Sequence, residues 1–292
     1  EASGKYNTMI EASEAKAATY SDELHEQNLA KWREWKRNGR PEPGMRWPSD
    51  ARTGNRRPAN LYNGQVHPIV GYGIRGVIWY QGESNGNRGY QYRHLFQLLI
   101  TSWRERWQQG DFSFYWVQLA DYKMEVAQPT ESDWPKLREA QTMALDLPNT
   151  GQAVAIDLGE GRDIHPRDKL TVGNRLARVA LARDYGFSID YESPRFGSMQ
   201  RSGADIIITF DYVSESGLWA FDTEQVFGFA IAGKDQKFVW ADAEILSRNK
   251  VRVFNADVEA PVAVRYGWEM NPVLNLYDRN GLPVTPFRTD DW

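Results

Sequence analysis

The sequence of 292 residues contains no cysteine, which excludes disulfide bonds, thiolate metal sites and a cysteine nucleophile. It also lacks any apolar run of the roughly 18 residues that a transmembrane helix requires, so we expect no membrane span. An excess of one charge sign is missing as well, because the net charge is −4 and no long basic run occurs. We therefore expect neither nucleic acid nor a membrane surface as a partner.

Hydrophobic residues, in contrast, make up 41% of the chain and aromatic residues 13%, as in globular proteins. The 12 tryptophans and 14 tyrosines are compatible with carbohydrate binding, since flat rings stack on sugar faces, but core packing explains them equally well. The first residues do not form a signal peptide, and they resemble the interior of a longer protein.

Three composition regions indicate the domain organisation. Residues 1–60 predict a helical and loop insertion, with one or two exposed helices ending at Asn38 and Gly39 and a loop rich in proline and arginine after them. Residues 61–193 alternate between strand and helix patterns. Residues 194–292 show short alternating strands separated by turns, which predict an accessory antiparallel β domain, a β-sandwich.

The middle region predicts an α/β fold. We expect strands at residues 76–79, 112–119 and 152–158. Gly110 is expected to cap the first helix at its C-terminus, and Asp168 to cap the third helix at its N-terminus. Three strand–helix units in succession predict a parallel, doubly wound sheet. Three strands are few for helices this apolar, so at least two more strands are expected from outside this chain.

Polar residues follow the first predicted strand. Val77, Ile78 and Trp79 suit a strand that is covered on both faces. Gly82 permits a sharp turn, which groups Gln81, Glu83 and Asn85 at the sheet edge where open α/β folds bind ligands. A turn whose amides only satisfy the loop backbone explains this pattern equally well.

A second polar loop, residues 159–166, lies between the third strand and the third helix, at the same sheet edge. Here Asp163 precedes His165, and a carboxylate beside an imidazole fixes the tautomer that a general base needs. The other three histidines lie in predicted helices or directly before a proline. The loop alone favours a structural pairing, but its expected position beside the first motif favours catalysis.

Four motifs together resemble the sialate O-acetylesterase family, within the SGNH (GDSL-like) hydrolases. They are GIRGVIWYQGESN at 73–85, LREAQ at 137–141, DIHPRDK at 163–169 and PFRTDDW at 286–292. The resemblance covers nearly everything from Leu61 onward. It implies a hydrolase domain with a flavodoxin-like SGNH sheet. Such a domain removes acetyl groups from sugar hydroxyls without a metal or cofactor. The expected partner is an acetylated carbohydrate, and the expected location is secreted or periplasmic.

The same resemblance implies roles for individual residues. It makes His165 the base, Asp163 its orienting acid and Gln81 a donor to the oxyanion. Glu83 and Asn85 would support the substrate or the residues that touch it. The superfamily spaces its acid and histidine as Asp-x-x-His, whereas Arg162 occupies that acid position here, so Asp157 and Glu160 stay open as alternatives.

The nucleophile motif of the family, Gly-Gln-Ser-Asn or Gly-Asp-Ser, does not occur in this sequence. Ser84 occupies a variable place in the family motif, and neither Ser188 nor Ser198 follows a strand–helix turn, so we assign none of them. We expect the serine on a preceding segment, linked or as a separate chain.

Two other functions remain as alternatives. One is a catalytically inactive protein that binds sugar in the same pocket. The other is a metal-dependent hydrolase using Asp157, Asp163 and His165, although one histidine with closely spaced acids makes a poor first-row metal site. The sequence leaves the acetylated sugar open.

Overall fold

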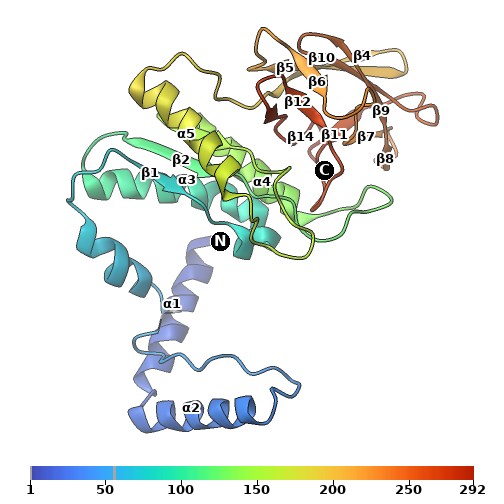
Figure 1. Cartoon of the computed structure of the whole chain (residues 1–292). Coiled ribbons are helices and arrows are strands. Elements are labelled where there is room, and N and C mark those ends of the chain that lie inside the picture. The colour runs from blue at the N-terminus through green and yellow to red at the C-terminus, as the bar shows by residue number, and fades with distance from the viewer. Residues whose placement is uncertain (1, 55–56) are drawn as a thin grey trace. The chain divides into compact units, whose positions relative to one another are not determined.

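A computed structural model describes residues 2–54 and 57–292 (Figure 1). Glu1, Asn55 and Arg56, which fall in the segment predicted as a helical and loop insertion, lie outside the described residues. The chain divides into two compact units, residues 1–72 and 73–292. Within the described ranges, every helix is too short or too polar to traverse a bilayer.

The smaller unit consists of helices and irregular chain. Its helices are α1 (Ala2–Ala18), α2 (Asp22–Arg37), a π-helical turn (Tyr62–Val66) and a 3-10 turn (His67–Ile69). Ser21 caps α2 by accepting a hydrogen bond from Leu24 N at 3.1 Å. Helix α2 ends at Arg37, its C-cap is Asn38, and Gly39 follows at φ +79°, so of the one or two exposed helices that were predicted, the structure has two.

The larger unit begins with a three-stranded sheet in the order β1-β2-β3. The strands are β1 (Gly76–Trp79), β2 (Ser113–Val117) and β3 (Thr150–Ala153), and both pairings are parallel. Helices α3 (Gly89–Trp107), α4 (Asp133–Met143) and α5 (Lys169–Tyr185) follow the three strands in turn. Short 3-10 turns, Glu83–Arg88 and Ala144–Asp146, precede α3 and follow α4. The predicted parallel sheet is therefore confirmed.

Helices α3 and α4 pack against each other, whereas α5 packs against β2 and β3. The fully buried Phe96 of α3 meets the Trp116 indole of β2 edge to face, with ring centroids 5.1 Å apart. Ile78 of β1 is 71% exposed, so the expectation that both faces of this strand are covered is wrong. The reason is that α5 packs on β2 and β3 and leaves β1, at one edge of the sheet, uncovered.

Two further boundaries differ from the sequence predictions. Helix α3 ends at Trp107 and is capped by Gln108 in the left-handed conformation at φ +54°, so Gly110 follows the cap and does not form it. Strand β3 ends at Ala153, earlier than predicted. Directly after the strand, the Val154 carbonyl accepts a hydrogen bond from the Arg175 guanidinium at 2.6 Å, so this carbonyl pairs with a side chain.

Gly151 lies where β3 and α5 come closest, since a methyl group added there would sit 2.4 Å from Val179 Cγ1. We expect Gly151→Ala, in the complete protein, to lower the free energy of unfolding by about 1–3 kcal/mol, because the close-packed core has no room for it. Gly173→Ala on α5 is the matched control, since nothing lies within 4 Å of the added methyl. That control should be neutral or stabilising by up to about 1 kcal/mol. Urea unfolding measures both, and equal midpoints would contradict the packing argument.

The rest of the larger unit is an antiparallel β domain. Its sheets have the orders β4-β5-β10-β9, β14-β11-β7-β8 and β13-β12-β6. The strands are β4 (Arg195–Ser202), β5 (Asp205–Asp211), β6 (Leu218–Ala220), β7 (Phe229–Ala232), β8 (Phe238–Trp240), β9 (Asp242–Ser247), β10 (Lys250–Phe254), β11 (Ala263–Tyr266), β12 (Leu276–Asp278), β13 (Leu282–Pro283) and β14 (Phe287–Arg288). Residues of the two four-stranded sheets, such as Ile208 and Ile231, share one hydrophobic core.

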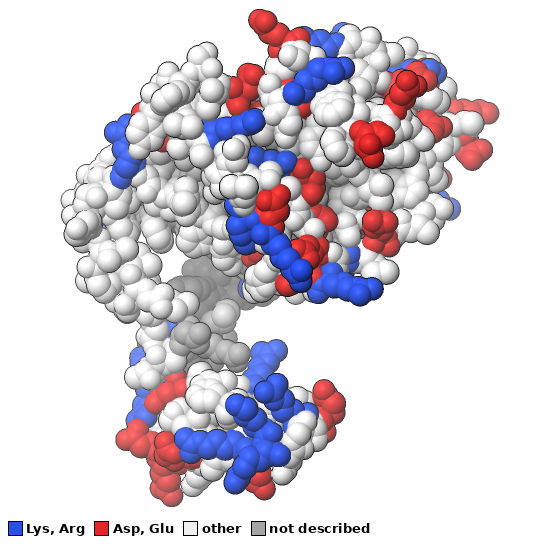
Figure 2. Space-filling view, in the orientation of Figure 1, with Lys and Arg blue, Asp and Glu red and all other residues white. Residues whose placement is uncertain are grey.

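Charged side chains of both signs are visible on each unit in Figure 2. The sequence has 35 basic and 39 acidic side chains, so neither sign dominates. On the smaller unit, Lys and Arg side chains gather on part of the visible face, with Asp and Glu side chains beside them.

Candidate active site

The chain turns sharply after β1 and places Gln81 at the carboxyl end of the sheet. Gly82 has φ +157°, and its N–H donates to Glu83 Oε2 at 2.9 Å. Asn85 N donates back to Gly82 O at 2.8 Å, which starts the 3-10 turn. Glu83 and Asn85 thus stabilise the turn that carries Gln81.

Gln81 is half-buried, and its side-chain orientation is set by one contact. The Tyr92 hydroxyl of α3 donates to Gln81 Oε1 at 3.4 Å. Burial raises the pKa of Tyr92 to about 12, so this hydroxyl keeps its proton at neutral pH. With its oxygen occupied, Gln81 presents its amide nitrogen, for which the described part of the chain supplies no acceptor.

The loop between β3 and α5 brings Asp163 and His165 together. His165 N donates to Asp163 Oδ1 at 2.9 Å, and His165 Nδ1 lies 3.3 Å from the same oxygen. The backbone N–H of His165 holds the pKa of Asp163 below its usual range, with the imidazole adding to the effect. The His165 side chain is 80% exposed and is open to a ligand.

The two alternative acids are engaged elsewhere. The Asp157 carboxylate accepts hydrogen bonds from two guanidinium nitrogens of Arg175, at 2.6 and 2.7 Å, and from the Tyr277 hydroxyl at 3.0 Å. Glu160 accepts from Arg167 N at 3.3 Å. Among the described residues, Asp163 is thus the one of the three acids that contacts the imidazole.

Side chains beside the two motifs place them at the same edge of the sheet. Tyr80, next to Gln81, packs against a cluster that includes Leu158 and Val172, just before and after the His165 loop. Lys169 Nζ at the start of α5 lies 4.6 Å from the centroid of the Tyr80 ring. The hydrogen bonds of the described residues do not link Gln81 to His165 directly, so the two side chains share an edge without touching through such a bond.

Arg138 holds this edge in place, and the sequence assigned no role to it. Its guanidinium is fully buried and donates to four backbone carbonyls, those of Leu119, Ala120, Glu269 and Met270, at 2.7–2.9 Å. Burial lowers the pKa of Arg138 to about 9. The motif at 137–141 contains Arg138 and was the one sequence signal for this residue. It did not reveal the acceptors, because Glu269 and Met270 lie far from Arg138 in the sequence.

Gln141 and Asp121 complete this support. Gln141 accepts from Leu119 N at 2.9 Å and donates to Val117 O at 3.3 Å, which fixes the end of β2. Asp121 accepts from Gly159 N at 2.6 Å and so joins the end of β2 to the His165 loop. Burial raises the pKa of Asp121. These residues position backbone, and none of them was singled out from the sequence.

The geometry does not support the metal-dependent alternative. Within residues 2–54 and 57–292, no group of three or more His, Asp or Glu side chains is arranged to hold a metal ion. Asp157, which that alternative needs as a ligand, forms its bidentate pair with Arg175.

Comparisons with known proteins agree with one another. Residues 53–182 match a family described as carbohydrate esterase, sialic acid-specific acetylesterase. Sialate O-acetylesterases of Mus musculus and Homo sapiens are each 30% identical, over 82% of this chain and 49% and 50% of their own length. The crystal structure of a carbohydrate acetylesterase from Xanthomonas citri is similar with a TM-score of 0.75 and 44% identity, covering 80% of this chain and 54% of that one. The chain thus spans about half the length of the curated relatives it matches.

Proposed function

The chain belongs to the carbohydrate esterase family of the sialic acid-specific acetylesterases, and from this we propose that it is part of an enzyme that removes acetyl groups from sugar hydroxyls. The observation that carries the proposal is the Asp163–His165 pair, with Nδ1 3.3 Å from the carboxylate at the carboxyl end of a parallel sheet. Such a pair is what acyl transfer requires of its base.

We also propose that the parallel sheet is the C-terminal part of an SGNH-type hydrolase sheet, and that the β domain is a sandwich accessory to it. The strand order β1-β2-β3 runs in one direction, whereas a doubly wound sheet reverses its order at a switch point. Strands beyond the open β1 edge would supply that reversal. The exposed Ile78 on β1 supports this arrangement, because an apolar side chain at a sheet edge gains from being covered.

In the proposed mechanism, a serine from outside this chain attacks the acetyl carbonyl. His165 carries its proton on Nδ1, donates it in a hydrogen bond to Asp163 and accepts the serine proton on Nε2. Gln81 Nε2 donates to the oxyanion of the tetrahedral intermediate. The imidazolium then gives its proton to the departing sugar oxygen, which leaves an acetyl-enzyme. Water, deprotonated by His165, releases acetate and restores the serine.

The three acids near His165 should differ in their effect on the reaction. We expect Asp163→Asn to lower kcat more than Glu160→Gln or Asp157→Asn, because Asp163 alone of the three contacts Nδ1. Asp157→Asn should instead lower the free energy of unfolding, since Arg175 would lose its charged partner in a nearly buried site. Steady-state kinetics and thermal unfolding of the three variants separate these effects. A greater loss of kcat in Glu160→Gln than in Asp163→Asn would refute the ranking.

A fluorophosphonate probe tests where the nucleophile lies. The complete protein is treated with the probe, and the labelled serine is mapped by peptide mass spectrometry. We expect the label on a serine outside these 292 residues. Labelling of Ser84, Ser188 or Ser198 would overturn the proposed mechanism.

Hydrolysis of p-nitrophenyl acetate separates catalysis from the alternative, an inactive sugar-binding protein. We expect residues 1–292 alone to show no hydrolysis and to fold poorly, since the open β1 edge lacks a partner. Adding the preceding segment, even as a separate chain, should restore both folding and hydrolysis. A complete protein that folds and does not hydrolyse the ester would favour the inactive alternative.

A further inference from the structure

A cavity of about 330 Å³ lies in the larger unit beside the His165 loop, and the proposed reaction does not use it. Its wall is formed by the loop after β2, by residues around β7 and β8, and by residues 269–273. Asn271 joins the cavity to the loop. Its side-chain nitrogen donates to Lys123 O at 2.7 Å and would lie 3.5 Å from a methyl group placed on Gly161. One lining residue, Asn271, thus lies next to Gly161 in the loop that carries His165.

Apolar side chains form one wall of the cavity. Phe227 is 37% exposed and Val273 is 54% exposed, so both present apolar surface to a ligand. Trp240 is half-buried, and its indole N–H donates to Ala127 O at 3.0 Å, which fixes the plane of the ring. An aromatic ring that is held in one orientation can stack on the flat C–H face of a sugar ring.

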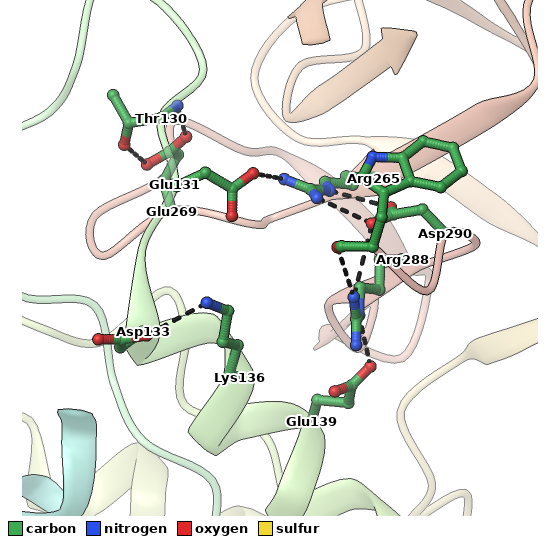
Figure 3. A network of polar contacts seen from close by, with 10 residues as sticks. Thr130, Glu131, Asp133, Lys136, Glu139, Arg265, Glu269, Arg288 and Asp290 are labelled. Carbon is green, nitrogen blue, oxygen red and sulfur yellow. Dashed lines mark hydrogen bonds and ion pairs between the residues drawn. The ribbon is translucent and has the colours of Figure 1, made fainter. Parts of the chain in front are cut away.

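Polar groups face this wall, and all of their formal charge is negative. Glu269 is 4% exposed, and its two oxygens accept from Thr130 N at 2.6 Å and from Thr130 Oγ1 at 2.7 Å (Figure 3). Burial raises the pKa of Glu269, and the Thr130 hydrogen bonds oppose that effect. Asp242, Gln225 and Asn271 add further polar atoms, and no lysine or arginine is among the lining residues.

We propose that this cavity binds a neutral sugar unit adjoining the acetylated one, so that the substrate is a neutral oligosaccharide or polysaccharide. Carboxylates accept hydrogen bonds from sugar hydroxyls, and amides both accept and donate them. The carboxylate of an acidic sugar would instead meet the exposed Asp242, with no lysine or arginine among the described lining residues to pair with it. The proposal rests on the esterase function, because the cavity opens beside the loop that carries the proposed base.

The size of the cavity agrees with this assignment. Small-molecule sites in proteins are about 300–1,000 Å³, and the cavity lies at the lower end of that range. It has room for one or two sugar rings and not for a longer stretch of chain. The remaining sugar units would extend into solvent or toward His165.

Isothermal titration calorimetry on the complete protein tests the proposal without any chemical step. The probes are xylotetraose and cellotetraose, which are neutral and carry no acetyl group, and sialyllactose, which is anionic. We expect the neutral probes to bind and sialyllactose to bind at least about tenfold more weakly. Phe227→Ala and Asp242→Asn should each weaken binding of the neutral probes by about tenfold, because one loses the stacking ring and the other loses a charged acceptor.

Matched controls come from the same unit. Phe187→Ala removes an aromatic side chain that is 57% exposed, and Asp222→Asn neutralises an exposed acid, both outside the cavity wall. Neither should change binding of the neutral probes. A Trp240→Phe variant keeps an aromatic ring in the wall and should bind more tightly than Trp240→Ala. Thermal unfolding of every variant identifies any that fails to fold.

The outcomes separate this inference from the esterase function. Unchanged binding in folded Phe227→Ala and Asp242→Asn would overturn the cavity assignment, even if the protein hydrolyses p-nitrophenyl acetate. Tighter binding of sialyllactose than of the neutral probes would overturn the charge argument. Binding of neutral probes that the cavity variants weaken, in a protein without esterase activity, would uphold the cavity and reject the esterase proposal alone.

Discussion

Alanine at position 165 should lower kcat for deacetylation by about three orders of magnitude or more and change KM little. His165 lies 80% exposed at the carboxyl end of the sheet, and Asp163 orients its ring through Nδ1. The ring accepts a proton in the transition state and contributes little to holding the ground-state substrate, so the loss should fall on kcat. Steady-state kinetics of the complete protein with p-nitrophenyl acetate and an acetylated sugar give the two constants.

The histidine of α3 supplies the control for this experiment. His94 is also exposed, but it lies on α3 and outside the loop that carries Asp163, so His94→Ala should keep wild-type kinetics. A His165→Ala protein that retains most of its kcat, with a normal unfolding temperature, would dispose of the assignment.

Alanine in place of Gln81 should cost about 3–4 kcal/mol of transition-state stabilisation, a loss in kcat of roughly 10²–10³. The Tyr92 hydroxyl donates to the side-chain oxygen of Gln81, so the amide nitrogen is the atom left to donate to an oxyanion. Gln81→Glu should be at least as damaging, because it places an acceptor where a donor is required. The same kinetic assays measure both variants.

Gln200→Ala, at an exposed position of β4, is the matched control and should leave kcat unchanged. Near-normal kcat in Gln81→Ala would mean that the Gln81 amide has a structural role only and does not donate to the oxyanion. A loss in Gln81→Ala that appears mainly in KM would assign the amide to substrate binding instead of to the oxyanion.

Local signals predicted most of the α/β architecture. Asp168 caps α5 by accepting from Thr171 N at 2.9 Å, as expected, and Gly186 follows the helix in the left-handed conformation. Strand β4 lacks such a signal, because most of its side chains are exposed and no alternation of apolar residues marks it. The exposure of Ile78 was missed because an apolar run does not reveal which of its neighbours the chain supplies.

In the candidate site too, some contacts could be predicted from the sequence and others could not. Asp163 and His165 lie two residues apart in one loop, so their contact could be predicted from spacing alone. The acceptors of Arg138 include Glu269, which lies 131 positions away, and no local pattern connects the two. The residues proposed to carry the chemistry could thus be picked out in the sequence, whereas the residues that hold the backbone beneath them were identified only in the structure.

The hydrogen bonds of Arg138 tie the α/β part of this chain to its β part. Two of its four acceptors belong to the segment after β2 and two to the segment after β11, so one cation serves both parts at once. An engineered chimera that replaced the β part with another would leave a buried guanidinium with half of its partners. A replacement would therefore have to supply two carbonyl oxygens at the positions of Glu269 and Met270.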